Sequence, residues 1–156
     1  AIASAAATAS TAPLKDQFND LINNWQRVKK AALFDLTARD LNSVLSGKAL
    51  TTQLGAIKWL QDHHKHYEMD AKSVAVDHYV ELVRGQKYAV YAKVIESSKY
   101  IDDTNKEVLK EVDDDSYTVN YTVEKSQDHW LITDFSKLTN SGNNDQTVKG
   151  PSKASR

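Results

Sequence analysis

The sequence lacks cysteine altogether and has little glycine or proline. Its 156 residues include no Cys, five Gly and two Pro. The missing thiols exclude disulfides, cysteine nucleophiles, thiolate zinc sites and iron–sulfur clusters. No glycine-rich loop that could cradle a phosphate is present, and no nucleophile elbow or Ser/His/Asp pattern is visible. Nucleotide binding and serine-hydrolase chemistry are therefore not expected.

Excess charge and long apolar runs are missing as well. The chain has 20 Lys and Arg residues against 21 Asp and Glu residues, a net charge of −1. A general nucleic-acid binder usually carries a basic excess, so no nucleic-acid partner is predicted. No apolar run approaches the roughly 18 residues of a membrane span. The hydrophobic content of 40% and the charged content of 26% are typical of one globular domain.

The two ends of the chain differ in composition from its centre. Residues 1–13 are rich in Ala, Ser and Thr, which predicts a linker. Residues 139–156 are polar and nearly free of apolar side chains, which predicts a disordered tail. The single folded domain is therefore expected at residues 14–138.

Apolar residues recur at steps of three and four over positions 14–32, which predicts a first helix with Pro13 at its first turn. A short second helix is predicted after Leu36. Thr37 is its candidate N-cap, Asp40 acts like the acid of a capping box, and Gly47 ends it. These features indicate two consecutive helices before residue 50.

A third helix is predicted from about Leu50 to His63, with Leu54 on its apolar side. Gly55 interrupts its interior at a cost of about 1 kcal/mol relative to alanine. We interpret this glycine as a sign of close packing against a neighbouring element.

Period-two alternation then replaces the helical spacing and predicts four strands, which form two antiparallel hairpins. The strands are expected at Met69–Val83, Tyr88–Ile95, Tyr117–Glu124 and His129–Phe135. Helices followed by strands indicate an α+β fold. We expect the N-terminal helices to pack in the concavity of a curved antiparallel sheet of about four strands, giving a cone.

The segment Asp102–Asp115 between the two hairpins contains seven acidic residues and two lysines. It lacks the alternating ligands and the glycine of an EF-hand loop. It could bind a cation or a basic segment. The preferred interpretation is a long loop exposed to solvent.

Histidines supply the main candidates for chemistry. His63, His64 and His66 lie near Glu68, and imidazole with carboxylate suits zinc or nickel. Their spacing matches no helical metal motif. The competing interpretation is a solvated helix end, where protonated histidine complements the helix dipole. It is preferred, so neither a metal nor a cofactor is predicted.

His78 could form an acid–base pair with Glu96 or Asp134 if these side chains meet across the sheet. A pair with Asp77 would need a bend, because neighbours on a strand point to opposite faces. The competing interpretation is a histidine packed at the edge of the sheet.

Several segments between residues 14 and 136 carry a family resemblance. They are Asn24–Leu33, Asp40–Leu50, Tyr67–Met69 with Lys72–Val74, Ala92–Tyr100, Tyr117–Tyr121 and Trp130–Thr133. These segments resemble the C-terminal domain of plastid-division proteins of the chloroplast accumulation-and-replication type and of the cyanobacterial ZipN-type cell-division proteins. This domain is called the IMS domain, for intermembrane space.

The resemblance implies a non-enzymatic domain that binds a partner. In plastid members the domain lies beyond an inner-membrane helix and binds the tail of an outer-membrane partner. The implied location here is the periplasm or the plastid intermembrane space, as the soluble part of a membrane-anchored protein. The family pattern supplies no catalytic residues and assigns no binding residues one by one.

Three functional hypotheses remain open. The first is an interaction domain that binds a peptide or domain of a division protein between the helices and the concave face of the sheet. Its cleft walls are assigned provisionally to aromatic residues, because aromatics anchor interfaces. The second is an NTF2-like small-molecule or enzymatic domain that uses His78 and a carboxylate, and the third is a sensor domain of another membrane protein. The provisional wall residues are Trp59, Tyr79, Tyr88, Tyr91 and Tyr121.

Overall fold

The computed structural model describes residues 12–138, so the predicted tail and nearly all of the predicted linker lie outside the described residues. Two α-helices and a 3₁₀ turn precede four strands. The elements are α2 (Leu14–Asp35), η1 (Leu41–Ser43), α3 (Gly47–His63), β1 (Lys65–Val83), β2 (Lys87–Asp102), β3 (Glu107–Ser126) and β4 (His129–Leu138).

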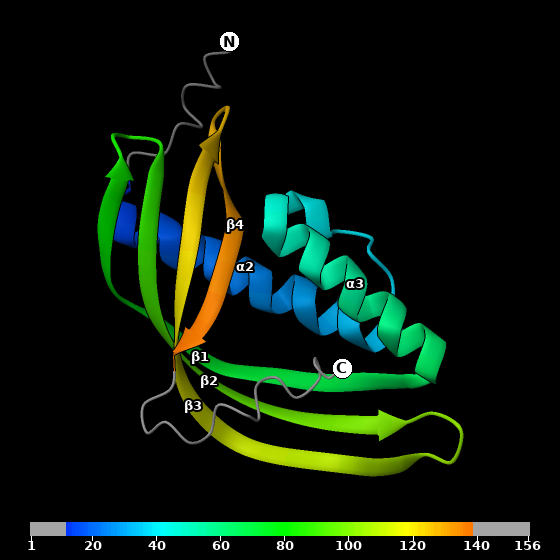
Figure 1. Cartoon of the computed structure of the whole chain (residues 1–156). Helices are drawn as coiled ribbons and strands as arrows, with labels where there is room; N and C mark the ends of the chain where they lie inside the picture. The colour runs from blue at the N-terminus through cyan, green and yellow to red at the C-terminus, as the bar shows by residue number, and fades with distance from the viewer. Residues whose placement is uncertain (1–11, 139–156) are drawn as a thin grey trace.

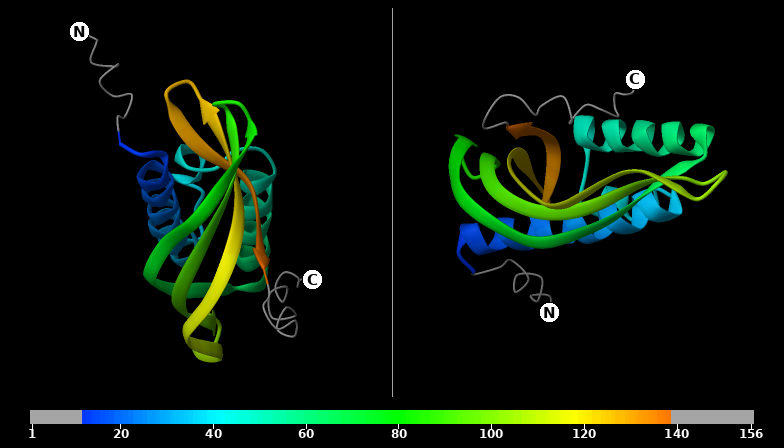
Figure 2. Two further views of the ribbon diagram at one scale, coloured as in Figure 1. Left: turned by 90° about the vertical axis from the view of Figure 1, so that its left-hand side faces the viewer. Right: turned by 90° about the horizontal axis from the view of Figure 1, so that it is seen from below.

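The four strands form one antiparallel sheet in the order β1-β2-β3-β4. Figure 1 shows that β1, β2 and β3 bend strongly between an upright arm and a horizontal arm, and that both helices lie inside the bend. Figure 2 shows that α2 and α3 lie apart from each other, with part of the sheet visible between them. The predicted α+β architecture, with helices against the concave face of a curved sheet, is confirmed.

The hydrophobic core lies between α2 and the concave face. Phe18, Ile22 and Trp25 of α2 are almost fully buried, at the three- and four-residue steps of one helix face. Along β2, alternate residues from Tyr88 to Glu96 are buried, which identifies this face of the strand as the inner one. The opposite face of β2 carries Tyr91 and Lys93. Among residues 12–138, neither helix combines the length and apolar character needed to cross a membrane.

The predicted second helix is wrong. The chain turns after α2 and forms only the single 3₁₀ turn η1, and Gly47 begins α3 instead of ending a helix. The backbone of this connection pairs with β4: Ile132 N–H donates to Val44 O at 2.8 Å, and Ser46 N–H donates to Ile132 O at 2.9 Å. Tertiary hydrogen bonds at the edge of the sheet have therefore overridden a local capping signal.

The predicted acidic loop is also wrong. β2 continues to Asp102 and β3 begins at Glu107, so only a short turn separates them. In that turn the Asp102 carboxylate accepts hydrogen bonds from the backbone N–H of Thr104 at 2.9 Å and from its hydroxyl at 2.6 Å. These bonds lower the pKa of Asp102. The hairpin was hidden because this arm is largely exposed, so its sequence lacks apolar alternation.

Gly55 does not mark a packing contact, because a methyl group placed there would meet nothing within 4 Å. The neighbouring Leu54, expected on the apolar side, is also exposed. We therefore expect Gly55→Ala to raise the free energy of unfolding by about 0.5–1 kcal/mol, because alanine restricts the unfolded chain and favours helix. Urea denaturation measures this change.

Gly47→Ala is the matched control for this prediction. The φ of Gly47 is 56°, which strains any L residue, so this variant should lose roughly 1 kcal/mol. A loss of stability in Gly55→Ala would contradict the assignment of open space beside α3.

Candidate functional site

An open cleft of about 750 Å³ lies between the C-terminal half of α2 and the strands β1, β2 and β3. It mixes apolar side chains with charges of both signs. Its lining residues are Arg27, Lys30, Ala31, Phe34 and Asp35 of α2, Glu68, Met69 and Asp70 of β1, Ser97, Ser98 and Lys99 of β2, and Glu111 and Asp113 of β3.

Helical spacing explains which side of α2 lines the cleft. Arg27, Ala31 and Phe34 follow one another at steps of four and three, so they share one face. Leu33 of the same helix is buried in the core, whereas the Phe34 side chain is 53% exposed. The Phe34 ring packs edge-on against the His66 ring of β1, with 5.2 Å between ring centres. A half-exposed aromatic ring therefore lines the cleft.

A smaller cavity of about 240 Å³ shares Met69 and Ser98 with the cleft. Tyr67 and Tyr100 stack on one side of it, with 4.8 Å between ring centres. Burial, with a smaller contribution from Tyr100, raises the pKa of Tyr67 to about 12. The phenol of Tyr67 therefore stays neutral at physiological pH.

A charge network centred on the buried Glu96 borders the smaller cavity, which Glu96, Tyr117 and Lys137 line. Lys29 Nζ of α2 lies 2.8 Å from Oε2 of Glu96, and the Tyr117 hydroxyl donates a hydrogen bond of 2.6 Å to Glu96 Oε1. Lys137 Nζ lies 4.1 Å from the centre of the Tyr117 ring. These contacts join α2 to β2, β3 and β4.

The network fixes the protonation states of its members. Burial alone would raise the pKa of Glu96, but Lys29, the hydrogen bonds and Lys137 outweigh it, so the pKa is lowered. Burial and then the charge of Glu96 raise the pKa of Tyr117. At neutral pH the carboxylate of Glu96 is therefore ionised and the phenol of Tyr117 is neutral, whereas a catalytic acid–base pair is usually tuned to titrate near neutral pH.

The five aromatic residues assigned provisionally to the cleft walls do not meet at one surface, and none of them lines the cleft or the smaller cavity. Trp59 lies on α3, where it stacks on His63. Tyr79 and Tyr88 pack against Phe18.

The other two provisional wall residues lie on opposite faces of the sheet. Tyr121 is only 2% exposed in the core, where Gln26 donates a hydrogen bond of 3.4 Å to its hydroxyl. Tyr91 lies on the outer face and stacks against His78. Phe34 and Met69 line the cleft instead. The sequence offered one indication that Phe34 could line a site: it is an aromatic residue outside the apolar positions predicted for the first helix.

The catalytic pair proposed for His78 is not formed. Its contacts are the Tyr91 ring, with 4.5 Å between ring centres, and the Asp77 carboxylate, 3.3 Å from Nδ1. The strand register shifts between Val76 and His78, which supplies the bend that the contact with Asp77 required. Glu96 lies on the opposite, inner face of the sheet.

Asp134 likewise lies away from His78. Its carboxylate accepts a hydrogen bond from the backbone N–H of Phe135 at 2.9 Å, and in the sheet it pairs with Thr122. His78 lies on β1, which β2 and β3 separate from β4 in the sheet. Neither candidate carboxylate therefore approaches this histidine.

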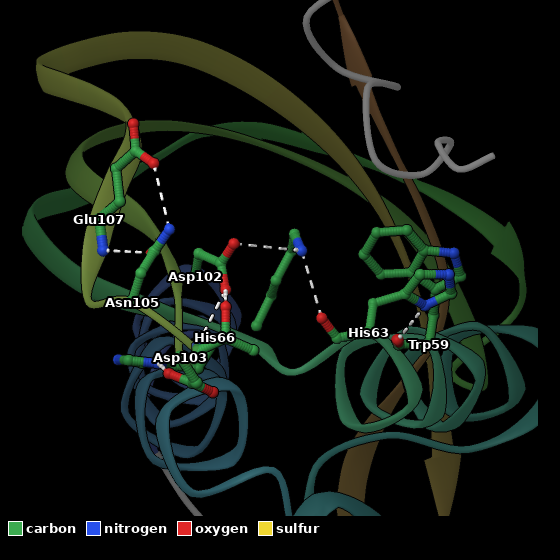
Figure 3. A network of polar contacts seen from close by, with 9 residues as sticks. Trp59, His63, His66, Asp102, Asp103, Asn105 and Glu107 are labelled. Carbon is green, nitrogen blue, oxygen red and sulfur yellow. Dashed lines mark hydrogen bonds and ion pairs between the residues drawn. The ribbon is translucent and has the colours of Figure 1, made fainter.

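The histidines near residue 64 also separate in space, as Figure 3 shows. His63 ends α3, with Nδ1 at 2.8 Å from Trp59 O. His66 lies on β1 with Nδ1 at 2.6 Å from Asp103 Oδ1. His64 caps α3 through its backbone. Within residues 12–138, no group of three or more His, Asp or Glu side chains is arranged to hold a metal ion.

Together, two helices packed on a bent four-stranded sheet and an open cleft of mixed polarity define an α+β domain with a surface cleft beside α2. Residues 19–133 match the family described as "ARC6-like, IMS domain". The chain therefore belongs to this family, which confirms the resemblance to plastid-division proteins. The relation to the cyanobacterial ZipN type stays a prediction.

A solved structure described as "Crystal structure of intermembrane space region of chloroplast protein ARC6" shares this fold. The TM-score is 0.73 and the sequence identity is 24%, over 81% of this chain and 97% of that chain. No curated protein matches the chain significantly by sequence. The descriptions of the family and of the solved structure both name the intermembrane space, which agrees with the location that the resemblance implied.

Proposed function

We propose that this domain is a non-catalytic interaction domain of a membrane-anchored division protein. It binds a peptide or domain of a partner division protein on the far side of the inner or plasma membrane, in the periplasm or the plastid intermembrane space. The open cleft between α2 and the sheet is the binding site.

One observation carries this proposal: the cleft is open and presents an exposed aromatic side chain. Phe34 is 53% exposed, and Met69 lies with it in the cleft. Exposed aromatic and Met side chains in a concave surface are typical of protein-binding sites. No histidine lines this cleft in the described part of the chain, and His78 lies on the outer face of the sheet. Membership of a family of division-protein domains supports the same conclusion.

Capture of the partner tests the proposal. The immobilised domain is incubated with extracts of cyanobacterial cells and of plastid envelopes, and bound proteins are identified by mass spectrometry. We expect recovery of a division protein, and we expect Phe34→Ala to reduce it at least several-fold, because loss of an interface aromatic anchor commonly costs 2 kcal/mol or more, about 30-fold.

Leu54→Ala is the matched control, because Leu54 is another exposed apolar residue on a helix and does not line the cleft. It should capture the partner as the unmodified domain does. Recovery of no division protein from either extract by the folded domain would refute the proposal. Equal recovery with Phe34→Ala would place the binding surface elsewhere.

A further inference from the structure

The cleft has an acidic bias as well as an apolar surface. Five carboxylate side chains line it against three basic ones. β1 and β3 each contribute two of these carboxylates, and those of β3, Glu111 and Asp113, belong to the acidic segment of the sequence.

The basic residues of α2 are already engaged within the chain. Lys30 Nζ lies 3.8 Å from Asp70 Oδ1, and Arg27 donates a hydrogen bond to Asn24. Glu111 and Asp113 are exposed, and neither forms an ion pair with any residue of the described range 12–138. Lys99 of β2, the cross-strand partner of Glu111, forms no ion pair in this range either. Two carboxylates and one ammonium group of the cleft therefore lack an ion-pair partner, which leaves a negative excess next to the apolar surface.

We infer that the partner segment bound in this cleft carries an apolar anchor flanked by Lys or Arg residues. The inference rests on the proposed function and specifies its partner. The anchor packs on Phe34 and Met69, and the flanking cations pair with Glu111 and Asp113. Opposite charges placed around an apolar anchor select the partner and its orientation more than they raise affinity.

Three synthetic peptides test the inference. They share a Leu-Trp-Leu centre and are flanked on each side by two Lys, two Gln or two Glu residues. Each is titrated into the ¹⁵N-labelled domain, and amide shifts give the binding site and the dissociation constant. We expect the Lys peptide to shift the amides of Phe34, Met69 and Glu111 and to bind several-fold more tightly than the Gln peptide. High salt should abolish this difference, because it screens exposed charges.

A charge-removing variant makes the test specific. E111Q/D113N should weaken binding of the Lys peptide several-fold and leave binding of the Gln peptide unchanged. The matched control D77N/D128N removes the same charge from residues outside the cleft and should change neither. Asp77 lies on β1 and Asp128 lies in the β3–β4 turn, and neither residue lines the cleft.

The outcomes separate this inference from the proposed function. Equal or tighter binding of the Gln or Glu peptide in the cleft overturns the basic partner and leaves a peptide-binding cleft in place. Absence of cleft shifts with the Lys peptide at millimolar concentration also overturns it, whereas the proposed function is judged separately by capture of a division protein that depends on Phe34.

Discussion

Replacing Lys29 by methionine is expected to lower the free energy of unfolding by about 3–5 kcal/mol. The Lys29 and Glu96 side chains are 11% and 8% exposed, and Lys29 Nζ lies 2.8 Å from Glu96 Oε2. Methionine fills similar space but leaves the carboxylate of Glu96 buried without its cation. The cost of an unpaired buried charge greatly exceeds the net value of the pair. Urea denaturation at pH 7 measures the loss.

Lys30→Met is the matched control, because Lys30 neighbours Lys29 on α2 and forms a pair of 3.8 Å with Asp70 in which both side chains are about 60% exposed. It should change stability by less than about 0.5 kcal/mol. K29M/E96Q should recover part of the loss, because it removes the orphaned charge. Equal losses in Lys29→Met and Lys30→Met would contradict the structural role of the buried pair.

The same pair sets a dependence on acid. The pKa of Glu96 is lowered in the folded protein from its ordinary value of 4.5. Its ionised form therefore contributes stability that is fully present above about pH 4.5 and is lost as the pH falls through the lower folded pKa. The difference in stability between the unmodified protein and E96Q should shrink in that range.

Replacing Phe18 by alanine is expected to lower the free energy of unfolding by about 3–5 kcal/mol. Phe18 is fully buried, and its ring centre lies 5.2 Å from those of Tyr88 and Trp130 and 5.3 Å from that of Tyr79. It therefore joins α2 to β1, β2 and β4 at once. Loss of the ring leaves a cavity that three large aromatic neighbours cannot fill without moving. Thermal and urea denaturation measure the effect.

Phe34→Ala is a matched control, because it removes the same ring from the same helix at a position that is 53% exposed. It should cost less than about 1 kcal/mol. If Phe18→Ala is too unstable to measure, Phe18→Leu, which keeps most of the volume, should cost less than about 1.5 kcal/mol. Similar losses for Phe18→Ala and Phe34→Ala would contradict the assignment of the core face of α2.

Sequence periodicity predicted the elements that bury one face continuously. The first helix, the third helix and both hairpins were expected because their apolar residues recur at helical or strand spacing over many residues. The prediction failed between Leu36 and Gly47, where backbone pairing with Ile132 decides the conformation, and at the acidic end of the second hairpin. The first of these segments is fixed by hydrogen bonds to a residue far away in the chain. The second is fixed because the backbone pairing of β2 with β3 continues to the end of both strands.

The candidate site was less accessible from sequence. Aromatic residues were natural candidates for the cleft. An aromatic residue at an alternating strand position, however, is equally compatible with the core and with a binding surface. Tyr121 proved to be core, whereas Phe34 and Met69 opened onto the cleft. A single sequence does not show which of two helix faces has no neighbour.

The sequence by itself determined the class of fold and the absence of thiol chemistry, because local periodicity and composition can be counted without any tertiary contact. The family followed from the resemblance of particular segments. Only the tertiary structure decided which side chains meet. The bend of the sheet places Glu111 and Asp113 beside α2, and strand alternation separates His78 from Glu96. These contacts depend on the strand register and the curvature of the sheet, and both result from small backbone twists accumulated over many residues. The absence of cysteine and the scarcity of glycine thus excluded chemistries, whereas folding formed the apolar and acidic cleft that is proposed as the binding site.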